Sequence, residues 1–172
     1  MLQSKKKSFN QIKIHSQYSI CEGALKIENL KEYCKKNKIQ SVGLSDTYNL
    51  SGALEFSENI SSVGTQPIIG SQVQFKFKNT YGLIPLIAKN YNGYKNIIEL
   101  SSKAYLENDD NDQPHCSIED LTKYSDGIIV LSGAINNLIG NMFNKGLFEE
   151  LGELITILNN NFKENFYLEI QR

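Results

Sequence analysis

The sequence GIIVLS at residues 127–132 decides the predicted fold, because residues 128–131 form an unbroken apolar run. A strand that is apolar on both faces is expected where helices cover both sides of a sheet. Strand-like and helix-like segments alternate along much of the chain, which indicates parallel strands joined by crossover helices. The sequence therefore predicts an α/β fold in which a barrel-like sheet is sheathed in helices.

Hydrophobic spacing and turn residues predict the other elements. Further strands are expected at residues 9–15, 41–46, 67–77, 83–88 and 166–170, with a hairpin turn at 79–82. Helices are expected at residues 27–36, 49–61, 137–144 and 147–159, for about a dozen residues after Asn92-Gly93, and after a capping box at 117–120. The helix at 49–61 should place Leu50, Ala53, Leu54 and Ser57 on one side, strand residues 72–78 should have one exposed face, and the acidic tract 107–114 should form a surface loop.

Composition indicates one globular domain. The chain has 172 residues, of which 40% are hydrophobic and 22% charged, so we expect a flexible N-terminus at residues 1–8 and a domain at residues 9–172. The net charge is -1 and Arg172 is the only arginine, which argues against a general electrostatic attraction to nucleic acid or to a membrane. Three cysteines without a C-x-x-C pair and the lack of a long apolar run predict a soluble cytoplasmic protein.

The sequence IKIHSQYSICEGA at residues 12–24 resembles the end of a metal-binding strand that has lost ligands. Two histidines in a His-x-His pattern point the same way from a strand and can share an ion. Here Lys13 takes the first position, His15 the second, and Glu22 follows seven residues later. A lysine ammonium has no lone pair and cannot ligate a metal. We therefore expect the shape of the strand to persist without its metal chemistry.

A series of short motifs carries a family resemblance over nearly the whole chain. The motifs are HSQYS (15–19), EGA (22–24), LSD (44–46), NLSGALEF (49–56), PIIG (67–70), AKN (88–90), GYKN (93–96), LSSKAY (100–105), GIIVLSG (127–133) and YLEI (167–170). In this order they resemble the N-terminal PHP (polymerase and histidinol phosphatase) domain of the bacterial DNA polymerase III alpha subunit. The resemblance implies a distorted (β/α)7 barrel, of which this chain is an incomplete N-terminal portion because it ends inside a strand.

The resemblance also identifies the positions at which metal-binding members carry ligands. Lys13 replaces the first histidine, His15 retains the second, and Glu22 keeps a carboxylate where the family usually has aspartate. The remaining positions hold residues of other types: Thr47 for a histidine, Gln72 for a glutamate, and, by approximate alignment, Leu83 and Ala134. One imidazole and one carboxylate cannot hold two or three ions. We expect no metal, catalytic or cofactor-binding residues, although weak binding of a single ion by His15 and Glu22 stays open.

Several side chains have alternative interpretations. His15 is either a relic ligand or, as we favour, a half-buried histidine bonded by its neighbours. Lys13 either replaces the lost metal charge beside Glu22 or Asp46, or extends to solvent without a partner. Asp46 is either catalytic or, as we favour, a cap for backbone amides. Glu55 is expected to be solvated or salt-bridged.

The resemblance implies that the parent chain is a DNA-directed DNA polymerase, a nucleotidyltransferase of DNA replication that uses Mg²⁺ in downstream domains. This fragment alone should be inactive and need no cofactor. It should brace the rest of the alpha chain, dock the proofreading 3'-5' exonuclease subunit, and reach DNA through the downstream domains, without contact to a membrane. One alternative is an active metal-dependent phosphoesterase or 3'-5' exonuclease of the PHP superfamily. Another is a stand-alone binding module unrelated to replication.

Overall fold

The computed structural model describes residues 9–108 and 113–170. The predicted flexible N-terminus at 1–8 and part of the predicted loop at 107–114 lie outside these residues. The helices are α1 (Ile27–Asn37), α2 (Ala53–Ser61), α3 (Tyr91–Leu106), α4 (Ile118–Lys123), α5 (Leu138–Asn144), α6 (Phe148–Phe162) and the short 3-10 helix η1 (Lys163–Asn165). The strands are β1 (Ser41–Thr47), β2 (Gln66–Phe77), β3 (Thr80–Ala88), β4 (Cys116–Ser117), β5 (Ile128–Leu131) and β6 (Phe166–Tyr167).

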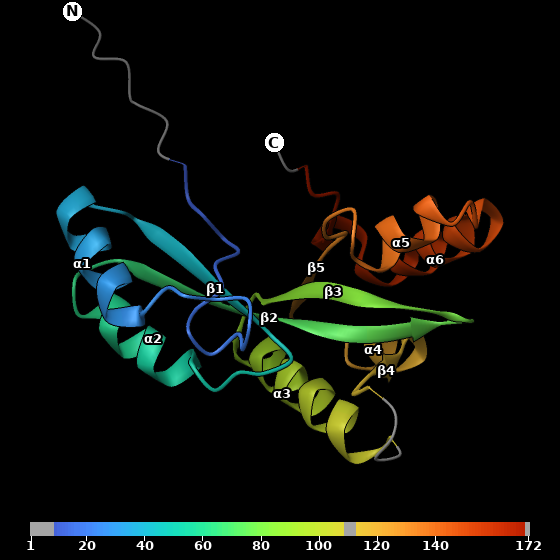
Figure 1. Cartoon of the computed structure of the whole chain (residues 1–172), viewed down its shortest axis with the longest axis horizontal. Helices are drawn as coiled ribbons and strands as arrows, with labels where there is room; N and C mark the ends of the chain where they lie inside the picture. Colours follow the sequence, from blue (N-terminus) through green and yellow to red (C-terminus); the bar gives the residue numbers. More distant parts are fainter. Residues whose placement is uncertain (1–8, 109–112, 171–172) are drawn as a thin grey trace, which may run out of the picture.

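The strands form one mixed six-stranded sheet in the order β1-β2-β3-β5-β6, with β4 paired to β2 (Figure 1). The pairs β1–β2, β2–β4 and β5–β6 are parallel, as expected for crossover connections. The pairs β2–β3 and β3–β5 are antiparallel. The predicted hairpin between β2 and β3 is therefore confirmed, and it makes the sheet more mixed than the alternation of strands and helices indicated.

Helices cover the sheet in two groups, each with its own apolar core (Figure 1). Helices α1 and α2 pack beside β1 around Ile27, Leu44 and Phe56. The larger cluster joins the β2–β3 hairpin and β5 to α3, α4, α5 and α6. Ile128 and Val130 of β5 are fully buried in it, as the apolar run at 127–132 predicted.

The start of α2 lies later than predicted, and the residues predicted to share one side of the helix differ in burial. The helix begins at Ala53 rather than at residue 49 because the Asn49 side chain accepts a hydrogen bond from the Ser51 amide (3.0 Å) and holds a turn there. The helix buries Ala53, Phe56 and Ile60, whereas Leu54 is 69% exposed.

The prediction of an exposed face along residues 72–78 is wrong for two glutamines. Gln72 and Gln74 are both buried, while Lys76 is exposed. Each glutamine is satisfied by side-chain hydrogen bonds: Gln72 bonds to Thr47 and Asn137, and Gln74 bonds to Tyr48 and Gln113. Amide side chains can be buried when their donors and acceptors are paired, so polar alternation did not mark a solvent face here.

The predicted first strand, at residues 9–15, is reduced to a bridge. The Ile14 amide donates to Gly43 O (3.0 Å) and the Ser45 amide donates to Ile14 O (2.8 Å), so this segment runs alongside β1. The predicted last strand at 166–170 is likewise limited to its first two residues, β6. Both segments still follow the sheet, and the first one delivers His15 to the end of β1.

Gly43 allows this close approach, and its replacement tests how the first segment is placed. A Cβ at Gly43 would lie 2.2 Å from the Ile12 carbonyl oxygen, which is backbone and cannot rotate away. We expect Gly43→Ala to lower the free energy of unfolding by about 2 kcal/mol, measured by denaturant titration. Gly152→Ala in α6 is the control: its Cβ meets no atom within 4 Å, and it should stabilise the helix by about 1 kcal/mol. Equal effects of the two substitutions would contradict this placement.

Candidate functional site

A broad cavity of about 1590 Å³ brings distant parts of the chain together. It is lined by the segment before β1, by β2, β3 and β5, and by the residues after β6. Six of the seven positions identified by the resemblance line it: Lys13, His15, Glu22, Gln72, Leu83 and Ala134. The seventh, Thr47, is hydrogen-bonded to Glu22 and Gln72. The structure therefore gathers all seven positions into one region.

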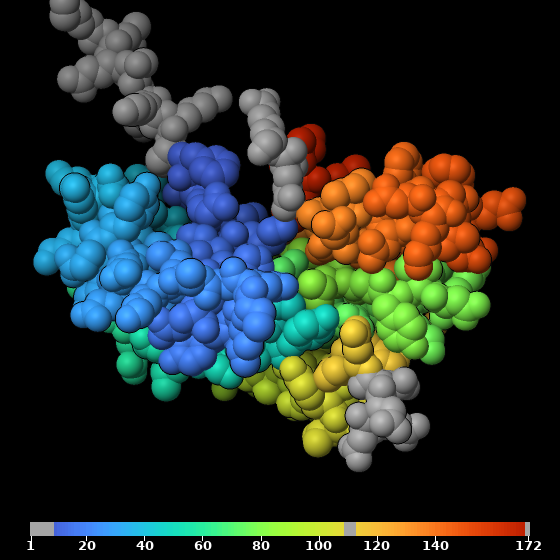
Figure 2. Space-filling view, in the orientation of Figure 1, coloured from blue at the N-terminus to red at the C-terminus, as the bar shows by residue number. Residues whose placement is uncertain are grey.

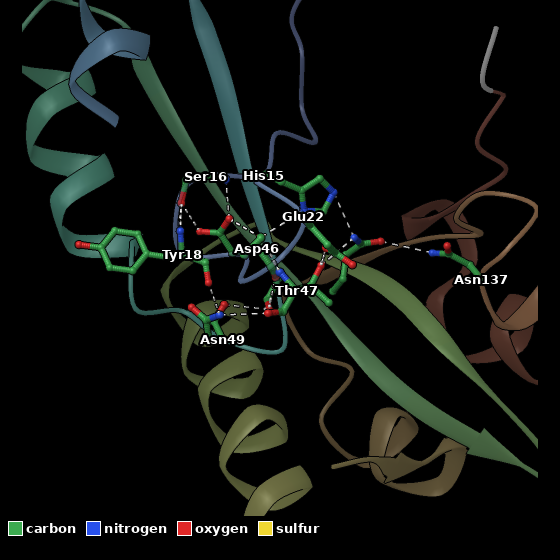
Figure 3. Close-up of polar contacts among 11 residues, drawn as sticks. His15, Ser16, Tyr18, Glu22, Asp46, Thr47, Asn49 and Asn137 are labelled. Carbon is green, nitrogen blue, oxygen red and sulfur yellow. Dashed lines mark hydrogen bonds and ion pairs between the residues drawn. The ribbon is translucent and has the colours of Figure 1, made fainter. Parts of the chain in front are cut away.

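A hydrogen-bond network links the polar members of this set at the end of β1 (Figure 3). Thr47 Oγ1 donates to Glu22 Oε2 (2.6 Å), and Gln72 Nε2 donates to Thr47 Oγ1 (3.3 Å). Asn137 Nδ2 donates to Gln72 Oε1 (3.3 Å), which fixes the orientation of the glutamine amide. The network thus joins the segment before α1, which carries His15 and Glu22, to the end of β1, to β2 and to the start of α5.

His15 takes part in this network through both ring nitrogens. Gln72 Nε2 lies 3.2 Å from His15 Nε2, and because an amide nitrogen can only donate, His15 Nε2 is the acceptor. The other ring nitrogen, Nδ1, lies 3.4 Å from Ser19 Oγ and 3.9 Å from Glu22 Oε2. The prediction of a half-buried histidine bonded by its neighbours is confirmed.

Asp46 holds the loop at residues 16–19 against β1. Its carboxylate is 1% exposed and accepts hydrogen bonds from the Ser16 amide (2.6 Å), Ser16 Oγ (2.7 Å) and Ser19 Oγ (2.7 Å). The favoured interpretation of Asp46 as a backbone cap is confirmed, although the capped amide belongs to this loop and not to α2. The sequence did not identify Ser16 and Ser19 as these donors, because they lie 27 to 30 residues from Asp46 and only their Ser-x-x-Ser spacing is visible in the chain.

Lys13 does not contact either of its predicted partners. Its ammonium forms an ion pair with Glu169 Oε1, and the two side chains are 14% and 16% exposed. The prediction of Glu22 or Asp46 as partner is wrong because Thr47 bonds Glu22 and the two serines surround Asp46. The alternative of a lysine without a partner is wrong as well. Glu169 lies 156 residues along the chain, and no local pattern in the sequence could have revealed it.

The prediction that Glu55 is solvated or salt-bridged is wrong. It is half-buried and accepts a hydrogen bond from the Tyr18 hydroxyl (2.6 Å). This hydrogen bond, and then the negative charge of Glu55, raises the pKa of Tyr18 above its ordinary value, because both favour the protonated phenol. The contact fastens the loop of residues 16–22 to α2 from the side opposite the cavity residue His15.

The buried cysteine Cys116 is not suited to nucleophilic chemistry. Its thiol donates to Leu100 O (3.2 Å), and burial raises the pKa of Cys116 to about 12. The thiolate is the nucleophilic form, so the side chain is protonated and unreactive near neutral pH.

The donor set fits a metal cluster poorly. Within residues 9–108 and 113–170, no three His, Cys, Asp or Glu side chains converge in a way that could hold an ion. His15 and Glu22 are the two members of the set with ligand chemistry, and both are engaged by neighbours.

Within residues 9–108 and 113–170, no helix combines the length and the apolar character needed to cross a bilayer.

Comparison with known proteins places the fold in one family. A family profile described as "PHP domain" matches residues 11–172, and the chain belongs to this family. Two solved structures share the fold with a TM-score of 0.52 each. The first is a putative metal-dependent phosphoesterase from Bifidobacterium adolescentis (11% identity, 88% of this chain and 83% of that one), and the second is an amidohydrolase from Chromobacterium violaceum (9% identity, 94% and 85%).

Relatives with curated names point to a narrower group of proteins than the family profile does. The chain is 36% identical to the DNA polymerase III subunit alpha of Borreliella burgdorferi, over 95% of this chain and 15% of the relative. The subunit of the same name from Caulobacter vibrioides is 32% identical with the same coverage, and that of Haemophilus influenzae is 32% identical over 95% of this chain and 14% of the relative. The chain therefore spans about 15% of the length of the curated relatives it matches.

Removal of the Asp46 carboxylate tests its role in the site. Asp46→Ala leaves a buried amide and two hydroxyls without their acceptor, so we expect it to lower the free energy of unfolding by about 3 kcal/mol in denaturant titrations. Asp126→Ala removes an exposed aspartate and should change it by less than about 0.5 kcal/mol. A similar small change for both variants would mean that Asp46 does not hold the loop.

The raised pKa of Tyr18 gives a pH prediction. The folded state holds this proton more tightly than the unfolded state, so the stabilisation is complete below the unfolded pKa and disappears as pH rises toward the folded pKa. Glu55→Gln should move the phenol titration, followed by absorbance or ring NMR signals, to lower pH. Glu58→Gln, on the same helix but exposed, should leave it in place. An unchanged titration in Glu55→Gln would refute the assignment.

Proposed function

We propose that this chain is the PHP segment of a replicative DNA polymerase alpha chain and that it serves as a scaffold without a metal cluster of its own. One observation carries the proposal. The seven positions that the resemblance marks within this chain are brought together, yet five of them hold an amine, a hydroxyl, an amide or a hydrocarbon, namely Lys13, Thr47, Gln72, Leu83 and Ala134. Cation affinity depends on the number and type of converging ligands.

The internal hydrogen bonds support a structural role for the set. Gln72 donates to His15 and to Thr47, and Thr47 donates to Glu22, so these polar groups are paired within the chain itself. A network of this kind specifies one arrangement of the strand ends. It stabilises the region in which metal-dependent members carry out chemistry.

The role of the parent chain is proposed from the names of the relatives. DNA polymerisation, a nucleotidyl transfer assisted by Mg²⁺, takes place in domains that this sequence does not cover. The partners are the rest of the alpha chain, the proofreading 3'-5' exonuclease subunit and, through the other domains, DNA; the location is the cytoplasm.

Exposed apolar side chains support a docking role. Phe143 and Phe148 pack edge to face with ring centroids 5.6 Å apart, and they are 57% and 62% exposed.

A metal-dependent phosphoesterase or 3'-5' exonuclease is the second candidate. It is favoured by His15 and Glu22, which keep an imidazole and a carboxylate 3.9 Å apart at the cavity. Two ligands of this kind suit at most one weakly held ion and do not supply the paired ions of such enzymes.

Metal analysis of the full-length protein decides between the two. We expect no stoichiometric zinc, manganese or magnesium at this site after purification and dialysis, and no phosphoesterase activity that chelation removes. The variant Lys13→His/Thr47→His/Gln72→Glu returns ligand chemistry to three positions and should bind Zn²⁺ more tightly than the wild type. The same variant with Lys89→His in place of Lys13→His is the control, because Lys89 lies at the cavity but outside the set. Two or three ions bound per wild-type chain, with activity that depends on them, would overturn the scaffold proposal.

A further inference from the structure

Two chain segments flank the cavity without being continuous strands of the sheet. Residues 9–15 contact β1 through backbone hydrogen bonds of Gln11 and Ile14, and residues 168–170 follow β6. The second segment is held by the Ser132 amide, which donates to Tyr167 O (2.9 Å), and by Ser132 Oγ, which accepts from the Glu169 amide (2.9 Å). In Figures 1 and 2 both segments, blue and dark red, lie at the upper side of the molecule. Each segment is attached to its own edge of the sheet.

The ion pair between Lys13 and Glu169 joins these two edges directly. Both side chains are largely removed from water, at 14% and 16% exposure. The Lys78–Glu153 pair elsewhere on the surface is 41% and 56% exposed, so water and salt screen it far more effectively. The charge interaction across the cavity is therefore the stronger constraint on the chain.

The other charged or ionisable groups at the cavity, Glu22, His15 and Lys89, form hydrogen bonds with uncharged side chains. Glu22 accepts the Thr47 hydroxyl, and His15 is bonded by Gln72. Lys89 is exposed and donates to Asn165 Oδ1 (3.1 Å). Lys13 is thus the cation that meets a carboxylate from the opposite edge, and it starts from the position at which a metal-binding strand carries its first histidine.

We propose that the Lys13 ammonium is a cation built into the chain. Through Glu169 it cross-links residues 9–15 to residues 168–170, as a bound ion cross-links its ligands. The comparison with an ion rests on the proposed function, whereas the cross-link rests on the contact itself. Lys13 is a positioning residue: it sets the separation of residues 9–15 and 168–170, and with it the width of the cavity. A single charge fixed to the backbone needs no metal supply and cannot be chelated away.

Hydrogen exchange of the full-length protein, followed by mass spectrometry, tests this cross-link. Lys13→Met removes the charge and keeps an apolar stem, and Glu169→Gln keeps the shape of its partner. In either variant we expect amides in peptides covering residues 9–15 and 166–170 to exchange about tenfold faster than in the wild type. The exchanged pair, Lys13→Glu with Glu169→Lys, should recover most of this protection. Lys78→Met, which breaks the exposed ion pair, should leave both peptides unchanged.

Two results would overturn the proposal: wild-type exchange in both single variants, or an exchanged pair no better protected than the singles. Each single variant tests the contact from one side, so failure of one variant to fold leaves the other to decide. Metal content, measured on the same wild-type preparation, separates this inference from the proposed function. If the wild type binds ions and the variants still exchange faster as expected, only the metal-free scaffold is refuted. If the wild type is metal-free and the variants exchange like the wild type, only the cross-link is refuted.

Discussion

The buried carboxylate of Asp46 is the constraint on which the site depends. It lies at the end of β1 and accepts three hydrogen bonds from Ser16 and Ser19, in a place that water does not reach. Hydrogen bonds to an ionised acceptor are among the stronger ones in proteins, and a buried charge is tolerated when donors of this kind surround it. They fix the loop that carries His15 and Glu22, so the rest of the network can form only while this loop stays against the strand.

Side-chain contacts connect several strand ends around the cavity. A metal cluster would draw ligands from several strand ends toward one charge. Here hydrogen bonds from Thr47 and Gln72 connect the neighbouring strands, and the Lys13–Glu169 pair spans the remaining distance. Amide and hydroxyl side chains are adequate for this because each can donate and accept, which lets the network close on itself.

Local signals in the sequence located most elements well. Helix α1 and strand β5 lie within one or two residues of their predicted bounds, and the capping box at Ser117 has both reciprocal hydrogen bonds with Asp120. The errors arose where tertiary contacts overrode a local pattern. The start of α2 was displaced by the turn at Asn49, and the glutamines of β2 were buried because partners from other elements satisfy them. The segment at 9–15 has the alternation of a strand but makes a single bridge with β1.

The sequence by itself determined which residue types stand at the seven positions, and hence that two of them keep ligand chemistry. It also determined that Asp46 lies at the end of a predicted strand, where a cap is expected. The tertiary structure alone decided which side chains meet: Glu169 with Lys13, Asn137 with Gln72, and Tyr18 with Glu55. These pairs are separated by 37 to 156 residues, and their contacts depend on the order and pairing of the strands. Spacing along a chain carries information about neighbours one or two turns away, whereas partners across a sheet are set by the packing of the whole core.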